Sequence, residues 1–299
     1  MLVAILGGTG FIGTALVSRL AASGARVRVL TRNLLHAKAL QVLPDVELMS
    51  ANVFDPRALG RALRGCDAVI NLVGILNERG FGGAGFDWVH HELTRRVVEA
   101  AIASAVPIML QMSSLGADAK SAPSYYLRSK GAAEDAVRAA SARLDFSIFR
   151  PSVIFGPHDS LFNRFAGLLR MTGGVLPLAK PDARLAPIFV DDVTLAFTRA
   201  LEQRSRASRQ SFDLCGPEIV SLEQLVRLTA QLIGLRARIV RLPDALAYTQ
   251  AMIMNLVPGK PFSTDNYRSL SVDSVCRDNG CARLGITPRP LRAIVPEYL

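Results

Sequence analysis

The chain has 299 residues, of which half are hydrophobic and a fifth are charged. This composition is ordinary for a globular protein and excludes an intrinsically disordered one. The formal net charge is +10, yet no basic run interleaved with aromatic residues appears, which argues against a nucleic-acid-binding protein. An evenly basic surface favours anionic partners instead, such as phosphorylated cofactors or acidic lipid headgroups.

The cysteines give no sign of a metal site. Cys66, Cys215, Cys276 and Cys281 lack metal-ligand spacing, and a structural zinc site needs four ligands. The first residues already form an apolar strand candidate, so we expect no secretory signal. A cytoplasmic protein with a reduced interior is the simplest interpretation.

The first half of the chain alternates predicted strands and helices. Apolar runs predict strands at residues 2–6, 25–31, 46–50, 68–73, 106–112 and 146–149. Helical spacing covers residues 11–22, and Asp55 before Pro56 is a plausible N-cap of another helix. This alternation predicts an α/β fold over residues 1–155, a Rossmann-type doubly wound parallel sheet with helices on both faces.

The regular alternation of predicted strands and helices ends after Pro151. Helical segments at 161–171, 193–202 and 222–233 are separated by short strand candidates at 211–214 and 238–241. No flexible linker or repeat is visible. We therefore predict a smaller C-terminal α/β lobe over residues 156–299, packed on the first domain and contributing some segments to it.

The glycine-rich stretch between the first predicted strand and helix has the spacing of a dinucleotide-binding turn. G-x-G-x-x-G begins at Gly8, directly after Gly7. Glycine permits the tight turn and a close approach of the backbone to a pyrophosphate, while the helix N-terminus attracts its charge. The sequence thus predicts a dinucleotide site formed by Gly7, Thr9, Gly10, Phe11, Ile12 and Gly13.

The end of the second predicted strand indicates which dinucleotide is preferred. An acidic residue there would bind the adenosine ribose and repel a 2′-phosphate. This chain has Arg32 instead, which is suited to a bidentate grip on phosphate. His36 and Lys38 could assist or simply face solvent. NADP(H) is therefore the predicted cofactor, with NAD(H) as the alternative.

Two further strand ends supply the rest of the predicted cofactor site. Asn52 and Val53 end the third strand, where an adenine would lie. Leu72, Val73 and Gly74 end the fourth, where backbone and small side chains would pass beneath the cofactor. Their order along the chain is that expected of a dinucleotide-binding fold.

Ser113, Ser114 and the stretch Tyr126-Leu127-Arg128-Ser129-Lys130 complete a familiar pattern. The chain resembles the extended and atypical short-chain dehydrogenase/reductase superfamily over nearly its whole length, including residues 150–157 and 189–193. Within it, residues 126–130, 242–245, 257–261 and 294–299 look most like the NADPH-binding accessory subunits of respiratory complex I and their bacterial relatives. The resemblance also implies cofactor contacts at Pro151 and Val153.

The resemblance implies catalytic roles for a tyrosine and a lysine. Tyr126 would exchange a proton with the substrate oxygen, and Lys130, one helical turn later, would lower the phenol pKa and bind the nicotinamide ribose. Tyr125 has the wrong spacing for this role. Ser113 and Ser114 are both candidates for the hydroxyl that holds the substrate oxygen. If Leu115 is the true equivalent, that donor is missing.

His90 occupies a place where relatives often carry asparagine. It could be a proton relay or an ordinary histidine of a helix. Three functions stay open on the sequence. The first is an NADP(H)-holding protein or slow oxidoreductase linked to the respiratory chain or to quinone metabolism. The second is a soluble nucleotide-sugar epimerase, dehydratase or reductase. The third is a non-catalytic NADPH-sensing regulator.

Residues 245–259 carry no charge at all. The segment is too short to span a bilayer, which needs roughly 20 apolar residues. A helix that is apolar all round is buried somewhere. Burial within the second lobe is the first possibility. The other is docking on the inner face of a membrane or on a membrane-bound respiratory partner, with Lys260 and Arg268 as the expected lipid contacts.

Overall fold

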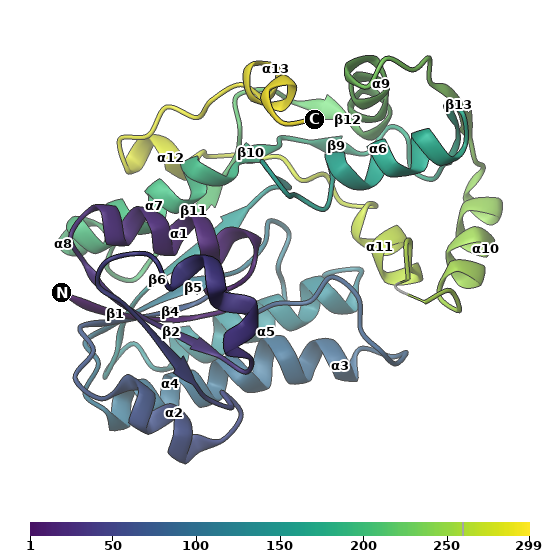
Figure 1. Ribbon diagram of the computed structural model, residues 1–299. Coiled ribbons are helices and arrows are strands. Elements are labelled where there is room, and N and C mark those ends of the chain that lie inside the picture. Colours follow the sequence, from purple (N-terminus) through teal and green to yellow (C-terminus); the bar gives the residue numbers. More distant parts are fainter. Residues whose placement is uncertain (259) are drawn as a thin grey trace.

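The computed structural model describes residues 1–258 and 260–299, without the side chain of His36. Its centre is a seven-stranded sheet in the order β11-β6-β5-β4-β1-β2-β3 (Figure 1). Every neighbouring pair of strands in it is parallel. The strands are β1 (Leu2–Leu6), β2 (Arg26–Thr31), β3 (Val46–Ser50), β4 (Ala68–Asn71), β5 (Ile108–Met112), β6 (Asp145–Pro151) and β11 (Gln210–Leu214).

This topology confirms the predicted Rossmann-type fold. The strand order reverses between β1 and β4, and ligands of such sheets bind in the crevice outside the carboxyl ends of the strands at that switch point. The strands are apolar because both faces of the sheet are covered. β11 comes from the second half of the chain, as expected of a lobe that contributes to the first domain.

Helices cover both faces of the sheet (Figure 1). On one face, α1 (Phe11–Ala22) and α7 (Val190–Glu202) pack together and bury Leu16, Val193 and Phe197 against the strands. On the other face, α2 (Pro56–Leu63), α4 (Leu93–Ala103) and α5 (Tyr125–Ala139) bury Leu59 and Val97 among others. The shorter elements of this half are η1 (Leu34–Leu40), α3 (Ala84–Phe86), η2 (Asp87–Glu92) and α8 (Arg204–Ala207).

The smaller lobe lies beyond the carboxyl edge of the sheet and has its own core around Phe155, Phe162 and Leu225. Its helices are α6 (Phe162–Met171), α9 (Leu222–Leu232) and α13 (Leu291–Ile294), followed by η3 (Val295–Glu297). Its strands pair as β7 (Ile154–Phe155) with β10 (Ile188–Phe189), β8 (Val175–Leu178) with β13 (Arg238–Arg241), and β9 (Arg184–Leu185) with β12 (Val220–Ser221).

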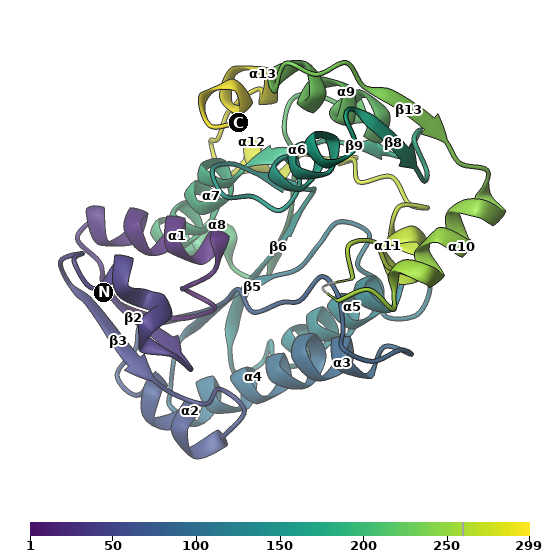
Figure 2. The same cartoon turned by 45° about the vertical axis from the view of Figure 1, so that its right-hand side comes forward.

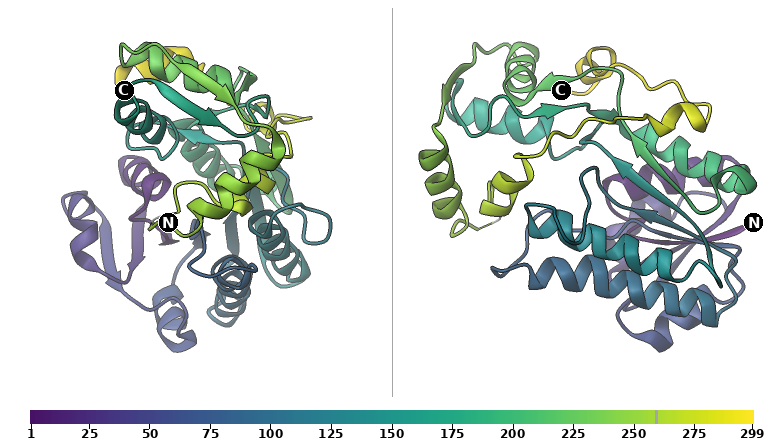
Figure 3. Two further views of the ribbon diagram at one scale, coloured as in Figure 1. Left: turned by 90° about the vertical axis from the view of Figure 1, so that its right-hand side faces the viewer. Right: turned by 180° about the vertical axis from the view of Figure 1, so that it is seen from behind.

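Two helices project from one side of the molecule between the two lobes (Figures 2 and 3). They are α10 (Asp244–Met254) and α11 (Thr264–Ser269), and α12 (Gly280–Arg283) leads back to the large sheet. No helix in residues 1–258 and 260–299 is long and apolar enough to cross a membrane.

A disulfide joins Cys215, directly after β11, to Cys276 in the segment that returns from α11. No spacing in the sequence predicted this pairing of residues 61 positions apart. It departs from the expectation of a reduced interior, because disulfides are rare in a reducing cytosol. Cys66 and Cys281 are buried free thiols.

Candidate functional site

The turn between β1 and α1 forms a cradle of bare backbone. Gly7 has a φ of +80°, and a Cβ there would lie 3.1 Å from the backbone of Leu72 and Val73. A Cβ on Gly13 would lie 2.2 Å from the carbonyl oxygen of Gly7, so only glycine lets α1 approach the turn. No side chain caps α1 at Gly10, which leaves the first N–H groups of the helix for an anion.

Three more residues were predicted to belong to the dinucleotide site. Thr9 lies in the turn before α1, and Phe11 and Ile12 are the first two residues of that helix. Thr9 and Phe11 are partly exposed, and Ile12 packs against the apolar core. All of these residues lie at the carboxyl edge of the sheet, next to the switch point between β1 and β4. The turn therefore fits a pyrophosphate approached by backbone amides.

Arg32 follows β2 with its side chain exposed, and it forms no ion pair within the described residues. Lys38 is also exposed, whereas the side chain of His36 lies outside the described part of the chain. Asn52 and Val53 follow β3. The Asn52 side chain accepts a hydrogen bond from the backbone N–H of Phe54 at 3.1 Å, and Val53 is buried.

The end of β4 is fixed by a buried asparagine. Asn71 donates through Nδ2 to Thr94 and to Gln111, and its Oδ1 accepts from the backbone N–H of Val73. This side chain therefore holds the chain where it leaves the sheet. Leu72 continues the ladder by one hydrogen bond to Leu6.

Gly74, three residues after β4, lies close to the side chain of Lys130. A Cβ on Gly74 would lie 3.2 Å from the Lys130 ammonium and 3.5 Å from Nε2 of His90. The backbone at Gly74 is thus in contact with the residues of α5 and η2 that the sequence singled out. This contact joins the predicted cofactor-binding strand end to the predicted Tyr-Lys pair.

The start of α5 positions Tyr126. Ser124 caps the helix by accepting from the backbone N–H of Leu127. The carboxylate of Asp265, on α11, accepts from the backbone N–H groups of Tyr125 at 2.7 Å and Tyr126 at 3.1 Å. A residue about 140 positions away therefore completes the helix terminus, and sequence reasoning missed it.

Lys130 lies one turn after Tyr126, as the spacing predicts. Its ammonium donates to the carbonyl oxygen of Met112 at 3.3 Å and lies 6.0 Å from the centroid of the Tyr126 ring. Burial lowers the pKa of Lys130 to about 8, against a smaller opposing effect of the Glu134 carboxylate. The ammonium is therefore charged at neutral pH but close to titration.

The pKa of Tyr126 is not lowered as expected. Burial raises it above its ordinary value, and a hydrogen bond with Ser114 opposes that effect. The Lys130 ammonium is engaged by a backbone carbonyl rather than by the phenol oxygen. At neutral pH the Tyr126 hydroxyl therefore keeps its proton.

The two serine candidates for the oxygen-holding hydroxyl, and Leu115 beside them, differ in their contacts. Ser113 donates to the buried carboxylate of Glu134 at 2.6 Å, so its hydroxyl is committed to a structural contact. Leu115 packs with Ala186 and Cys215, away from the tyrosine. The Ser114 hydroxyl donates to the carbonyl oxygen of Leu115 at 3.4 Å, and it also lowers the pKa of the Tyr126 phenol. Of the two serines, Ser114 is the one that is not committed to the Glu134 carboxylate.

Glu134 is the centre of a buried network that holds α5 against β6. Arg150 donates to it through Nε at 2.7 Å, and Arg138 donates to it at 2.8 Å. Pro151 and Val153 follow Arg150. Their carbonyl oxygens accept from the backbone N–H groups of Leu115 and Ile188, so both shape the carboxyl edge through backbone contacts.

His90 is a positioning residue. Its Nε2 accepts from the backbone N–H of Ile75 at 3.0 Å, and its Nδ1 lies 2.8 Å from the hydroxyl of Ser129, which itself donates to the carbonyl oxygen of Tyr126. Burial and the nearby Lys130 lower its pKa to about 2. The ring is therefore neutral, and both of its nitrogens are committed to hydrogen bonds: Nε2 accepts from Ile75, and Nδ1 carries the single ring proton toward Ser129. The π-helical turn η2 holds His90 in this position.

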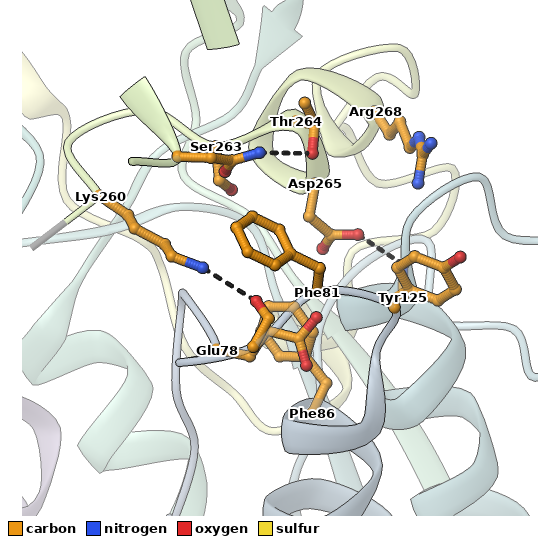
Figure 4. Close-up of a pocket in the computed structure, with 12 residues that line it drawn as sticks. Glu78, Phe81, Phe86, Tyr125, Lys260, Ser263, Thr264, Asp265 and Arg268 are labelled. Atoms are coloured by element: carbon orange, nitrogen blue, oxygen red, sulfur yellow. Dashed lines mark hydrogen bonds between the residues drawn. The ribbon is translucent and has the colours of Figure 1, made fainter. Parts of the chain in front are cut away.

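A pocket of about 190 Å³ opens beside Tyr125 and Phe86 (Figure 4). Phe86 lines it and also meets the Tyr126 ring edge-on, with centroids 6.0 Å apart. Tyr125, excluded as the acid/base residue by its spacing, faces this pocket. Glu78 fixes the loop on one side by accepting from the backbone N–H groups of Gly83 and Gly85. The remaining lining comes mainly from Phe81, Lys260, Asp265 and Arg268.

The titration of Lys130 predicts a measurable effect on stability. The pKa of about 8 in the folded protein lies below the ordinary lysine value of 10.5, so the unfolded chain binds more protons between these two values. The free energy of unfolding should therefore rise with pH from 8 to 10.5, by up to about 3 kcal/mol. Denaturant unfolding across this range should show the rise in the wild type and a flatter profile in Lys130→Met. If the free energy of unfolding changed with pH in the same way in both proteins, Lys130 would not have a lowered pKa in the folded state.

Comparison with known proteins agrees with this geometry. The family model described as NAD(P)H-binding matches residues 7–160. Ceramide reductase of Caulobacter vibrioides is 34% identical over 81% of this chain and 74% of its own length. The mitochondrial NADH dehydrogenase (ubiquinone) 1 alpha subcomplex subunit 9 of Arabidopsis thaliana is 28% identical over 99% of this chain and 76% of its own. A dTDP-glucose 4,6-dehydratase of Streptomyces venezuelae, solved with NAD, shares the fold at 20% identity and a TM-score of 0.78, covering 100% and 95% of the two chains.

Proposed function

Because this chain belongs to the NAD(P)H-binding family within the extended short-chain dehydrogenase/reductase superfamily, we propose that it is an NADP(H)-dependent reductase of a carbonyl group in a long-chain lipid. The observation that carries the proposal is the grouping of Ser114, Tyr126 and Lys130 at the carboxyl edge of the sheet. The lipid substrate class rests on the 34% identity to ceramide reductase.

A nicotinamide held at this edge of the sheet would supply the hydride for the carbonyl carbon. Ser114 and Tyr126 hold the carbonyl oxygen through their hydroxyl groups. Tyr126, whose raised pKa keeps it protonated, gives its proton to that oxygen, and an alcohol results. The Lys130 ammonium stabilises the phenolate left on Tyr126. A phenol that stays protonated at neutral pH is in the state that reduction requires of its proton donor.

Arg32 is the residue proposed to select NADP(H). Its exposed guanidinium stands at the end of β2, where an acidic residue would repel a 2′-phosphate. Arg32→Ala should remove about 1.5–3 kcal/mol of the preference for NADPH over NADH, the scale of a charge-assisted hydrogen bond. Calorimetry on the wild type, on Arg32→Ala and, as the control, on Arg206→Ala, which alters an exposed arginine of α8, measures it. Equal affinity of the wild type for both cofactors would refute the assignment.

The substrate class is tested by offering two kinds of carbonyl source. The protein is incubated with NADPH and either a 3-oxoceramide in vesicles or a set of nucleotide sugars, and NADPH absorbance is followed. Consumption with the lipid alone supports the proposal. Epimerised or dehydrated products from the nucleotide sugars would support a soluble sugar-modifying enzyme instead.

A second function is favoured by one observation. The likeness to the complex I subunit of Arabidopsis thaliana covers 99% of this chain, which supports a cofactor-holding protein attached to a respiratory partner. In that case Tyr126 and Lys130 grip the nucleotide and no reduction follows. Tight NADPH binding without turnover on either substrate would favour this function, or the related one of an NADPH-sensing regulator.

A further inference from the structure

The uncharged segment forms an exposed helix. Burial within the second lobe, the first possibility considered on the sequence, is wrong: α10 buries only Ala247 and Ala251. Ile253 is 62% exposed and Leu256 is 78% exposed. The short side chains of the two alanines let α10 rest on its neighbours, while its large apolar residues face outward.

A neighbouring loop extends this surface. Leu76 and Phe81, in the loop before α3, are also exposed. Contacts across the chain tie this loop to the segment that follows α10: Lys260 donates to the carbonyl oxygen of Gly80 at 2.9 Å, and its ammonium lies 4.4 Å from the centroid of the Phe81 ring. Together these parts form an apolar edge, made of Leu76, Phe81, Leu246, Met252, Ile253, Leu256 and Val257.

Positive charges surround the apolar edge. Arg79, Lys260 and Arg268 form no ion pair with any carboxylate in the described residues. The nearby carboxylates of Glu78 and Asp265 are buried, and each accepts two backbone N–H groups. The edge therefore presents apolar side chains and unpaired cations to its surroundings.

We propose that the apolar edge docks the protein on a bilayer rich in anionic lipids. Apolar side chains would enter the boundary between headgroups and acyl chains, while Arg79, Lys260 and Arg268 would face the headgroup phosphates. A second copy of this chain is a poorer occupant, because it would bring two cationic edges and two net charges of +10 together.

Docking in this orientation also places the pocket at the membrane. Phe81 and Lys260 belong to the edge or its rim and at the same time line the pocket beside Tyr125 (Figure 4). Asn255, which ends α10, lines the pocket as well. A lipid that leaves the bilayer there would meet a pocket lined by Phe86, whose ring contacts the Tyr126 ring edge-on. The docking itself does not depend on turnover and goes beyond the proposed reaction.

Vesicle flotation tests the proposal on the full chain. Vesicles of phosphatidylcholine alone and of phosphatidylcholine with phosphatidylglycerol are used at low and high salt. The variants are Ile253→Asp and Leu256→Asp, which alter exposed side chains. The control is Val42→Asp, since Val42 is 82% exposed and lies just before β3, on the opposite side of the molecule from α10 (Figure 2). Melting temperature and NADPH affinity, measured on each variant, show that the fold is intact.

The expected result is flotation of the wild type and Val42→Asp with anionic vesicles at low salt. Ile253→Asp and Leu256→Asp should each reduce the bound fraction at least fivefold. A wild type that stays unbound under every condition would overturn the proposal, as would α10 variants that bind as the wild type does. A concentration-dependent dimer that Ile253→Asp dissociates, without any flotation, would assign the edge to a second copy instead. Because flotation requires no substrate, a failure of docking is distinguishable from a failure of the proposed reaction.

Discussion

Tyr126→Phe should lower the rate of carbonyl reduction by about 100- to 10,000-fold, the range contributed by a positioned proton donor. The substitution removes the hydroxyl that lies within reach of Ser114 but keeps the ring packed edge-on against Phe86 and His90. NADPH affinity should therefore stay within a few fold of the wild type. Steady-state rates and calorimetry on the same preparations measure the two quantities.

Two serine variants test whether the loss of activity is specific to the proposed oxygen-binding site. Ser114→Ala should also slow the reaction, because it removes the other hydroxyl of the proposed oxygen site. Ser113→Ala should affect stability rather than the reaction, since Ser113 donates to Glu134. If Tyr126→Phe kept full activity, Tyr126 would not be the proton donor.

Gly13→Ala should have the largest effect on the fold and on cofactor binding. A Cβ at this position would lie 2.2 Å from the carbonyl oxygen of Gly7 and 2.6 Å from Cα of Gly8, both backbone atoms that cannot rotate away. The start of α1 must therefore move off the turn, at a cost of about 1–3 kcal/mol or more. Both the melting temperature and NADPH affinity should fall.

Gly60→Ala is the matched control for this substitution. Gly60 also lies inside a helix, α2, but a Cβ there would have no heavy atom within 4 Å. Alanine in a helix interior is favoured over glycine by roughly 1 kcal/mol, so this variant should melt at or above the wild-type temperature. A Gly13→Ala protein as stable as Gly60→Ala would show that the turn is not tightly packed.

The first half of the fold could be predicted from the sequence because its signals are local. Apolar runs and glycine turns place β1, β3 and α1 at the residues expected, and Asp55 caps α2 as predicted. β4 ends at Asn71, two residues early, because the Asn71 side chain binds the backbone of Val73 and ends the strand. Local periodicity does not reveal such a side-chain contact.

The remaining parts depend on residues far apart in the chain. α7 begins at Val190 rather than near residue 193, and Asp192 in its first turn accepts from Arg289, 97 residues away. The choice between Ser113 and Ser114 depends on where Glu134 lies. The pocket joins the loop around Glu78 to α11. No spacing rule in the sequence connects these segments, so their contacts could be identified only from the folded structure.

The sequence also left the environment of each site residue open. Tyr126 and Lys130 follow from spacing, but the raised pKa of the phenol results from burial that only the folded chain creates. His90 illustrates the same limit. Its role as a neutral anchor follows from its contacts with Ile75 and Ser129, and from sequence alone it remained either a relay or an ordinary helix residue.

The most direct test of the central proposal is the transfer of deuterium from labelled cofactor. The protein is incubated with NADPH deuterated at the hydride position of the nicotinamide and with 3-oxoceramide in vesicles, and the extracted lipid is analysed by mass spectrometry. The expected result is one carbon-bound deuterium in the alcohol formed by the wild type and, over the same incubation time, about 100- to 10,000-fold less labelled alcohol with Tyr126→Phe. Tight NADPH binding by the wild type without any deuterium in the lipid would contradict it.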